Sequence, residues 1–505
     1  MDGVLSGVLA EAVAQEGISL GWSLPFGLLL GCIALMPFAN RRWWEKWYPG
    51  VAVGLGGIVA GYYFLFAQSP WRWVEEMESY VSFIVLLGSL FVISGGIVIH
   101  VNRMATPAAN CVLLVMGAVV ANVFGTTGAS MLLIRPYLRM NGGHLKPFHM
   151  VFFIFIVSNV GGALTPIGDP PLFLGYLNGV PFWWVLSRCG WAWAAAVGML
   201  VAVFFVLDRI DHGKAARHDP GDPGAAVMIH GIHNLLLIGV VVWAVFQPGM
   251  FEVMRAMGGG LGLVKGVGEL LVSREVLMAV AAVGSVLLTG RRIYERNEFG
   301  YGPIREVAIL FFGIFSAMVP ALQWLDVNAG KLPLKTPGQY YFASGALSSV
   351  LDNAPTYLTL LQARLGRLDK GKVDLAVAEV KKMGERGTLE VDGVLDAEVR
   401  KAVGVVVEYH AKAVREKAVT RGQVEVAFLL GDGVLSAFVV AVSLGSVFFG
   451  ACTYIGNGPN FMVKSIAEAG GAAMPSFVGY VMKYTLPVLV PVYVVIWAVF
   501  LAGWW

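Results

Sequence analysis

The sequence predicts an all-α polytopic membrane protein: an inverted repeat of two five-span halves, each with a re-entrant hairpin and a discontinuous helix. Three observations support this fold. Only 14% of the 505 residues are charged and 57% are hydrophobic, whereas soluble proteins carry about 25% charged residues. Apolar stretches of spanning length recur along the chain. Four of them are interrupted by polar, Gly- or Pro-rich residues, and these interruptions form two similar pairs.

Ten apolar stretches are candidate membrane spans, two of which, 148–178 and 430–462, are interrupted. They lie at 20–38, 50–67, 80–100, 148–178, 182–207, 228–246, 274–290, 304–325, 430–462 and 480–502. Two more, 109–138 and 339–365, are too long for one span and are broken near their middles, so we expect re-entrant hairpins. The predicted organisation is an N-terminal segment (1–19), a first transmembrane repeat (20–218), a second repeat (228–365 and 425–505) and a soluble insert (366–424).

The insert stands out by its charge. Residues 366–424 hold 22 of the 69 charged side chains. Helical periodicity runs from Val373 to Met383 and from Leu395 to Val419, and Gly384, Gly387 and Gly393 predict turns between the helices. We interpret the insert as a solvated helical pair; a lid or docking surface is the alternative.

The interruptions predict an internal duplication. A shift of 227 residues places Val123–Leu138 on Val350–Leu365, and both segments read as a polar break followed by an apolar half-helix. A shift of 288 places Gly162–Phe173 on Gly450–Phe461 with seven identities in twelve positions. The two offsets differ by 61, about the length of the insert.

The topology follows from the count of spans. Five crossings per half are an odd number, so the two halves must be inserted in opposite orientations. Loop charge agrees if the N-terminus lies outside, because Lys and Arg then concentrate in the inside loops; the insert then lies outside. Inverted repeats with broken helices are typical of secondary transporters, whose site lies at the repeat interface.

Asp169 and Asp352 are the main candidate site residues. Each lies in a break at membrane depth, where an ionised carboxylate is costly without compensation. Each could also simply cap a half-helix, since Asp is a favoured N-cap residue and Pro170 follows Asp169. Their placement at the breaks, one in each half, favours binding of an ion such as Na⁺.

Hydroxyl and amide side chains surround these carboxylates in the sequence. Oxygen ligands with one or two carboxylates suit a hard cation such as Na⁺. The residues concerned are Thr126, Thr127, Asn159, Thr165, Asn353, Thr356, Thr453 and Asn457. Half-helix N-termini would also attract an anion, and Arg188 in the fifth span is the main argument for one.

Other chemistry finds little support in the sequence. The four cysteines lack metal or redox spacing, and no basic cluster with interleaved aromatic residues indicates nucleic acid. His149, like His230 and His233, falls near a span end and is interpreted as interfacial. We expect no catalytic residues and no cofactor.

The run Ser158–Asp169, which reads SNVGGALTPIGD, resembles the signature of the ion transporter superfamily, which includes NhaD-type sodium/proton antiporters, citrate carriers and arsenite pumps. Its Thr-Pro-Ile-Gly-Asp part looks most like the antiporter branch, and Asp352–Pro355 is similar to that branch's second-hairpin motif. The branch tends to carry an acidic–amide pair in the first hairpin as well, where this chain has Gly125-Thr126. The resemblance implies a moving transport unit on a fixed scaffold and a homodimer.

The resulting hypothesis is exchange of Na⁺ or Li⁺ for H⁺ by alternating access across a cell (inner) membrane of bacterial type, with Asp169 and Asp352 binding cation and proton in competition. The partners expected are the lipid bilayer and a small ion. The alternative is a carrier of citrate-like carboxylates or arsenite, and a third interpretation is a membrane enzyme or assembly subunit that uses the insert.

Overall fold

The computed structural model describes residues 18–503 except 68, 102–105, 143–144, 213–226, 259–262, 298, 388 and 390–395. Most of the predicted N-terminal segment, residues 1–17, therefore lies outside the described residues. The elements of the first half are η1 (Leu20–Ser23), α2 (Leu24–Ala39), α3 (Arg41–Leu65), α4 (Pro70–Gly95), β1 (Val98–Val101), α5 (Pro107–Met140), α6 (Pro147–Ile156), η2 (Val160–Gly162), α7 (Pro170–Leu177) and α8 (Trp184–His212).

The elements of the rest of the chain include the helical insert. These elements are β2 (Val227–His230), α9 (His233–Ala244), α10 (Met250–Gly258), α11 (Leu263–Leu271), α12 (Arg274–Leu288), α13 (Arg291–Arg296), α14 (Gly302–Asn328), η3 (Ala329–Lys331), α15 (Pro337–Ser348), α16 (Asn353–Leu365), α17 (Lys370–Arg386), α18 (Ala397–Arg415), α19 (Arg421–Leu430), α20 (Gly433–Phe449), η4 (Gly450–Cys452), α21 (Gly458–Ala469), α22 (Phe477–Tyr480), the π-helix η5 (Val481–Leu489) and α23 (Val490–Phe500).

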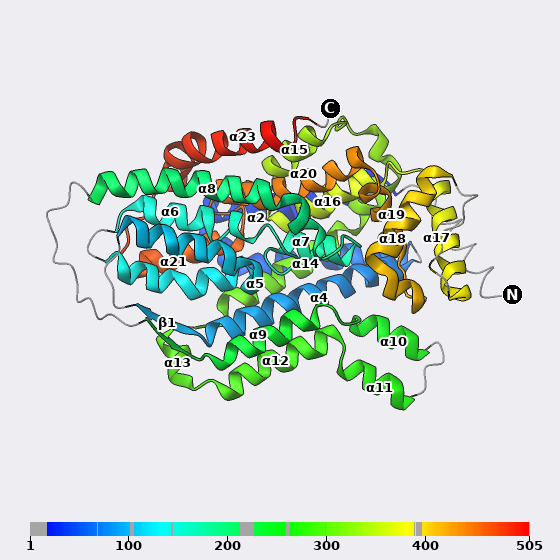
Figure 1. The fold of residues 1–505 in the computed structure, drawn as a ribbon, viewed down its shortest axis with the longest axis horizontal. Coiled ribbons are helices and arrows are strands. Elements are labelled where there is room, and N and C mark those ends of the chain that lie inside the picture. Colours follow the sequence, from blue (N-terminus) through cyan, green and yellow to red (C-terminus); the bar gives the residue numbers. More distant parts are fainter. Residues whose placement is uncertain are drawn as a thin grey trace.

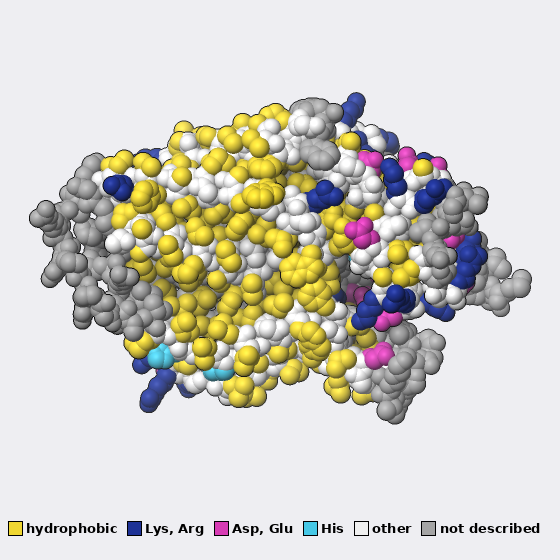
Figure 2. All heavy atoms as spheres, viewed as in Figure 1, with side chains coloured by type: hydrophobic (Ala, Val, Ile, Leu, Met, Phe, Trp, Pro, Cys, Tyr) yellow, Lys and Arg dark blue, Asp and Glu magenta, His cyan; other side chains and the backbone are white. Residues whose placement is uncertain are grey.

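The described residues form a polytopic helical membrane protein. Eight helical segments among them are long and apolar enough to cross a bilayer. Hydrophobic side chains cover the middle of the face shown in Figure 2, and charged side chains gather at the end where the insert lies. Figure 1 places the insert helices α17–α19 and strand β1 at opposite ends of the longest axis, along which most long helices run. The predicted membrane class is therefore confirmed.

Helix α5 is long enough to span but doubles back on itself. Gly125 interrupts it with φ 72° and ψ 156°. Asn110 and Asn141, near its two ends, exchange amide hydrogen bonds of 2.9 Å, although a straight helix would separate them by about 45 Å. The segment is a helical hairpin with its tip at Gly125.

The second hairpin, α15–α16, is built in the same way. The hydroxyl of Tyr340 donates to the carbonyl of Ala363 at 3.3 Å, so its two arms also lie side by side. Its tip is the non-helical segment 349–352. Both tips fall at the interruptions that the sequence predicts, because glycine, proline and side-chain caps end helices locally.

Each of the two broken spans packs against the hairpin from the other part of the chain. In the first, α6 and α7 are separated by an irregular segment at 157–169; in the second, α20 and α21 are separated at 450–457. Half-helix α7 packs on α16 of the second hairpin, and half-helix α21 packs on α5 of the first. This crossed packing brings all four interruptions to the centre of the molecule.

The prediction of a purely α-helical chain needs one correction. Strands β1 and β2 form a two-stranded antiparallel sheet in which Val98 pairs with His230 and Val101 with Val227. Helix α4 therefore ends at Gly95 and not at residue 100, and α9 begins at His233 and not at residue 228. Gly96, just before β1, and Gly231, just after β2, interrupt the helical pattern. The β-branched residues of the two strands favour extended backbone.

The insert has a small core of its own. Val373 and Val380 of α17 pack against Val403 of α18, and Phe428 extends this cluster into α19. The turn expected at Gly387 is present, with φ 68°, whereas Gly384 lies inside α17; Gly393 lies outside the described residues. The hydrophobic cluster of the insert thus extends past residue 424, through α19.

His410 of the insert contacts the chain just after α7. His410 interrupts the helical dihedrals of α18. Burial lowers the pKa of its imidazole, so Nε2–H of the neutral ring donates to the carbonyl of Gly179, just after α7, at 3.3 Å.

Candidate functional site

Asp169 lies at the centre of the candidate site. It is the residue before α7, in extended backbone (φ −144°, ψ 143°), and its side chain makes no capping bond to that helix. The carboxylate instead accepts hydrogen bonds from the Thr126 hydroxyl at 2.8 Å, from the Asn457 amide at 3.3 Å and from the Asn353 amide. Two hairpin tips and two broken spans thus converge on one carboxylate.

The four residues of this cluster form two pairs with the spacings of the predicted repeat. Thr126 and Asn353 are 227 residues apart and each begins the second arm of a hairpin. Asp169 and Asn457 are 288 residues apart and each precedes a half-helix. These are the same offsets that align the two halves of the sequence.

Two predicted ligands, Thr165 and Thr453, instead fasten the breaks to the hairpins. The Thr165 hydroxyl donates to the carbonyl of Asn122 at 2.6 Å, and the Thr453 hydroxyl donates to the carbonyl of Ser349, also at 2.6 Å. Each hydroxyl also accepts from a glycine N–H three residues later at 3.1 Å. The pairs obey the repeat offsets, so the structure places both threonines in equivalent supporting contacts.

Asn159 lies behind the cluster. Its amide donates to the Ile154 carbonyl at 2.8 Å and to Asn460 Oδ1 at 2.6 Å, while its Oδ1 accepts from Asn457 at 3.2 Å. It therefore holds Asn457 in place, and its bonded partners do not include Asp169. Asn460 continues this chain of amides to the carbonyls of Gly450 and Thr453.

The two predicted carboxylates have different hydrogen-bond partners. Asp352 is half-buried and caps α16, its Oδ1 accepting from the Ala354 N–H at 3.2 Å. Thr356 donates to the backbone carbonyl of Asp352 at 3.1 Å, one turn into the same helix. Neither side chain is hydrogen-bonded to Asp169. The capping interpretation therefore describes Asp352. Asp169 occupies the N-cap position of α7, but its side chain faces the cluster and does not cap the helix.

The electrostatics of the cluster favour a positive ligand. Asp169 is fully buried, and its three hydrogen-bond donors are all neutral. No Lys, Arg or His in the described part of the chain forms an ion pair with it. A buried carboxylate without a cationic partner is costly until it binds a cation or a proton.

Asn353 supplies a further oxygen. Its side chain is fully buried, and its Oδ1 has no hydrogen-bond partner among the described residues. A buried acceptor left without a donor costs about 1–3 kcal/mol. Since the amide already touches Asp169, this oxygen is available as a cation ligand beside the carboxylate.

A cavity of about 20 Å³ lies beside the first hairpin tip. This volume holds about one water-sized particle. It is lined by the tip (Gly125, Thr126, Thr127), by the first break (Pro166, Ile167, Gly168, Pro170, Phe173) and by α4 (Phe83, Leu86, Leu87, Leu90). Thr127, the remaining predicted ligand, lines this cavity. The space accommodates a small ion or a water, and a tricarboxylate is many times larger.

The hairpin tip depends on the left-handed conformation of Gly125. Changing Gly125 to Ala is expected to destabilise the protein by about 1–3 kcal/mol, because backbone with φ 72° and ψ 156° is essentially accessible to glycine alone. The new Cβ would also lie 3.3 Å from the Ile167 carbonyl oxygen of the first break. Thermal unfolding in detergent measures this loss. Gly190→Ala is the control, because its Cβ would meet no atom within 4 Å; equal melting temperatures of the two variants would contradict the assignment.

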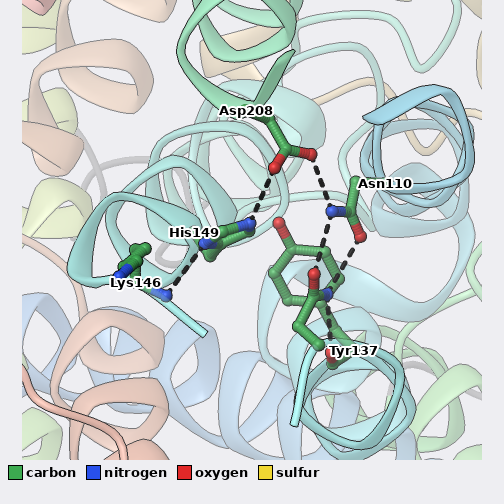
Figure 3. A network of polar contacts seen from close by, with 6 residues as sticks. Asn110, Tyr137, Lys146, His149 and Asp208 are labelled. Atoms are coloured by element: carbon green, nitrogen blue, oxygen red, sulfur yellow. Dashed lines mark hydrogen bonds and ion pairs between the residues drawn. The ribbon is translucent and has the colours of Figure 1, made fainter. Parts of the chain in front are cut away.

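A second polar network, missed by the sequence interpretation, lies at the open end of the first hairpin (Figure 3). His149 and Asp208 are both fully buried, with Nε2 and Oδ1 3.2 Å apart. Asp208 Oδ2 accepts from the Asn110 amide at 2.9 Å, and the Lys146 N–H donates to His149 Nδ1 at 3.1 Å. The sequence interpretation of His149 as interfacial did not include this burial or these partners. The signal in the sequence was Asp208, a carboxylate just past a predicted span.

Comparison with known proteins identifies a transport family. A family model described as "Putative citrate transport" matches residues 15–501, which includes both halves, the insert and all four cluster residues. No curated protein matches the chain. The match bears out an ion-transport family, and the closeness to the antiporter branch stays a prediction.

Proposed function

The chain belongs to this citrate transport family, and from that premise we propose that it is a secondary transporter that exchanges Na⁺ or Li⁺ for H⁺ at Asp169. Transport by a multi-pass membrane protein follows from the family and from the eight apolar helices. The choice of ion rests on one observation: a fully buried carboxylate whose hydrogen-bond donors are all neutral.

Exchange follows from competition at this carboxylate. A cation and a proton each neutralise Asp169, and both cannot do so at once. Thr126 Oγ1 and the free Asn353 Oδ1 would add oxygen ligands for Na⁺, which prefers such donors. Release of the bound ion alternately on the two sides of the membrane then couples the Na⁺ and H⁺ gradients.

Alternating access is supported by the crossed architecture. Each hairpin packs against the half-helix of the other half, as an inverted repeat with a central site would. In this proposal the hairpins are re-entrant, the N-terminus and the insert lie outside, and the membrane is the inner membrane of a bacterial cell. The homodimer suggested by the resemblance belongs to the same proposal.

A carboxylate carrier is the second candidate, favoured by the description of the family. Arg188, the residue expected to hold an anion, is exposed on α8, and its guanidinium lies 6.0 Å from the centre of the Trp184 ring. The cavity beside the cluster is small and mostly apolar. Citrate uptake would therefore require a wider conformation than this one, with the Asp169 cation as the coupling ion.

A flux panel in proteoliposomes tests the proposal. Purified protein is reconstituted with a pH-sensitive dye inside, and Na⁺, Li⁺, K⁺, citrate and arsenite are added in turn, with and without a pH gradient. We expect Na⁺ and Li⁺ to move protons and K⁺ to do so weakly. Uptake of labelled citrate without any cation-driven proton movement would replace antiport with the carboxylate carrier.

The different positions of the two aspartates give a separate prediction. Asp352→Asn is expected to keep proton flux within about threefold of the unmodified protein, because Asn caps a helix as well as Asp does. Asp352→Ala should lower stability by about 1 kcal/mol through the lost cap. Flux at saturating Na⁺ and melting temperature are the two measurements. Abolished flux in Asp352→Asn would show that both carboxylates bind the ion.

A further inference from the structure

Asp169 and Asn457 have nearly the same backbone setting. Asp169 has φ −144° and ψ 143°, and Asn457 has φ −155° and ψ 139°. Each is the N-cap residue of a half-helix with proline in its first turn, and neither side chain caps that helix. Both side chains point away from their own helices and meet, with Asn457 Nδ2 3.3 Å from Asp169 Oδ1.

Their side-chain partners differ in kind. Asp169 touches Thr126 of the first hairpin and its repeat partner, Asn353, of the second. Asn457 is held by Asn159 and by the Ser158 carbonyl, both at 3.2 Å. Neither position has a basic neighbour among these bonded partners. The backbone of the pair is therefore nearly symmetric, whereas the partners differ: Asp169 accepts from neutral donors, and the Asn457 amide donates to two oxygens that could also ligate a cation.

From this geometry we infer that position 457 sets the charge of the ion site, and that the single carboxylate can be moved from position 169 to 457 with ion exchange retained. The inference rests on the proposed function. Asn and Asp have almost the same shape, and neither side chain caps its helix here, so the exchange leaves the number of heavy atoms and the net charge unchanged. With one carboxylate, the site takes one monovalent cation or one proton in each half-cycle.

The double variant Asp169→Asn/Asn457→Asp tests the inference against Asp169→Asn alone. Na⁺-driven proton flux is measured in proteoliposomes at matched protein density, with melting temperature as the check on folding. We expect the double variant to recover at least about tenfold over Asp169→Asn, consistent with a restored charge at the site. A folded double variant with no more flux than Asp169→Asn overturns the inference.

The single variant Asn457→Asp decides the matter if the double variant does not fold. It places two carboxylates in contact, and such a pair holds a shared proton more tightly than one carboxylate does. We expect its flux against pH to shift to more alkaline pH by about one unit or more. An unshifted profile overturns the inference.

The Asp169→Asn variant distinguishes failure of the proposed function from failure of the inference. Undiminished flux in Asp169→Asn would overturn the proposed function and the inference together. Loss of flux in Asp169→Asn, without recovery in the double variant, would overturn only the exchange of the two positions.

Discussion

Asp169→Asn should reduce Na⁺-driven proton flux by at least about a hundredfold while leaving the protein folded. The amide has nearly the same shape as the carboxylate, but it carries no charge and takes up no proton, so neither ion can be bound in exchange for the other. The loss of a buried charge with neutral donors should not lower stability, since burying that charge is itself costly. Dye-reported flux and melting temperature in detergent measure the two effects.

Asn159→Ala serves as the comparison for Asp169→Asn. Asn159 lies in the same buried group of amides and contacts Asn457 but not Asp169. Its removal should lower stability and weaken flux only through the position of Asn457. If Asp169→Asn keeps more flux than Asn159→Ala, Asp169 does not carry the exchanged ions.

Asp208→Ala should give the largest loss of stability. The carboxylate accepts from Asn110 and lies 3.2 Å from Nε2 of His149, and all three side chains are fully buried. His149 Nδ1 already accepts from the Lys146 N–H, so the neutral ring must donate through Nε2. Removing the Asp208 carboxylate leaves one N–H of the Asn110 amide and the Nε2–H of His149 without an acceptor. Each such loss costs about 1–3 kcal/mol. Thermal unfolding in detergent reports the loss.

Asp211→Ala is the matched control, because Asp211 lies one turn further along α8 and is only half-buried. The two variants remove the same charge from the same helix. Asp208→Ala should unfold at a clearly lower temperature; equal melting temperatures would show that the network of Figure 3 contributes little to stability.

Much of the fold could be predicted because its signals are local. The breaks at Gly125, Thr165–Pro171, Asp352 and Asn457 consist of residue types that commonly end helices. The pairing of Val98 with His230 could not be predicted, because strand pairing across more than a hundred residues depends on where the intervening helices pack.

The site was predictable in composition but not in arrangement. Asp169, Asn353, Thr126 and Asn457 were all expected from polar residues at membrane depth, and the structure joins them by hydrogen bonds. The roles of Asp352 and Thr165 were not predictable, since a side chain near a helix start can cap the helix or face the cavity. Tertiary packing makes that choice.

Competition between Na⁺ and H⁺ at Asp169 is tested most directly by titration calorimetry of the purified protein with Na⁺. Comparing buffers of different ionisation enthalpy gives the number of protons released. The account predicts release of up to about one proton per Na⁺ bound, weaker binding at lower pH, and neither effect in Asp169→Asn. Sodium binding that is independent of pH, or that survives unchanged in Asp169→Asn, would contradict it.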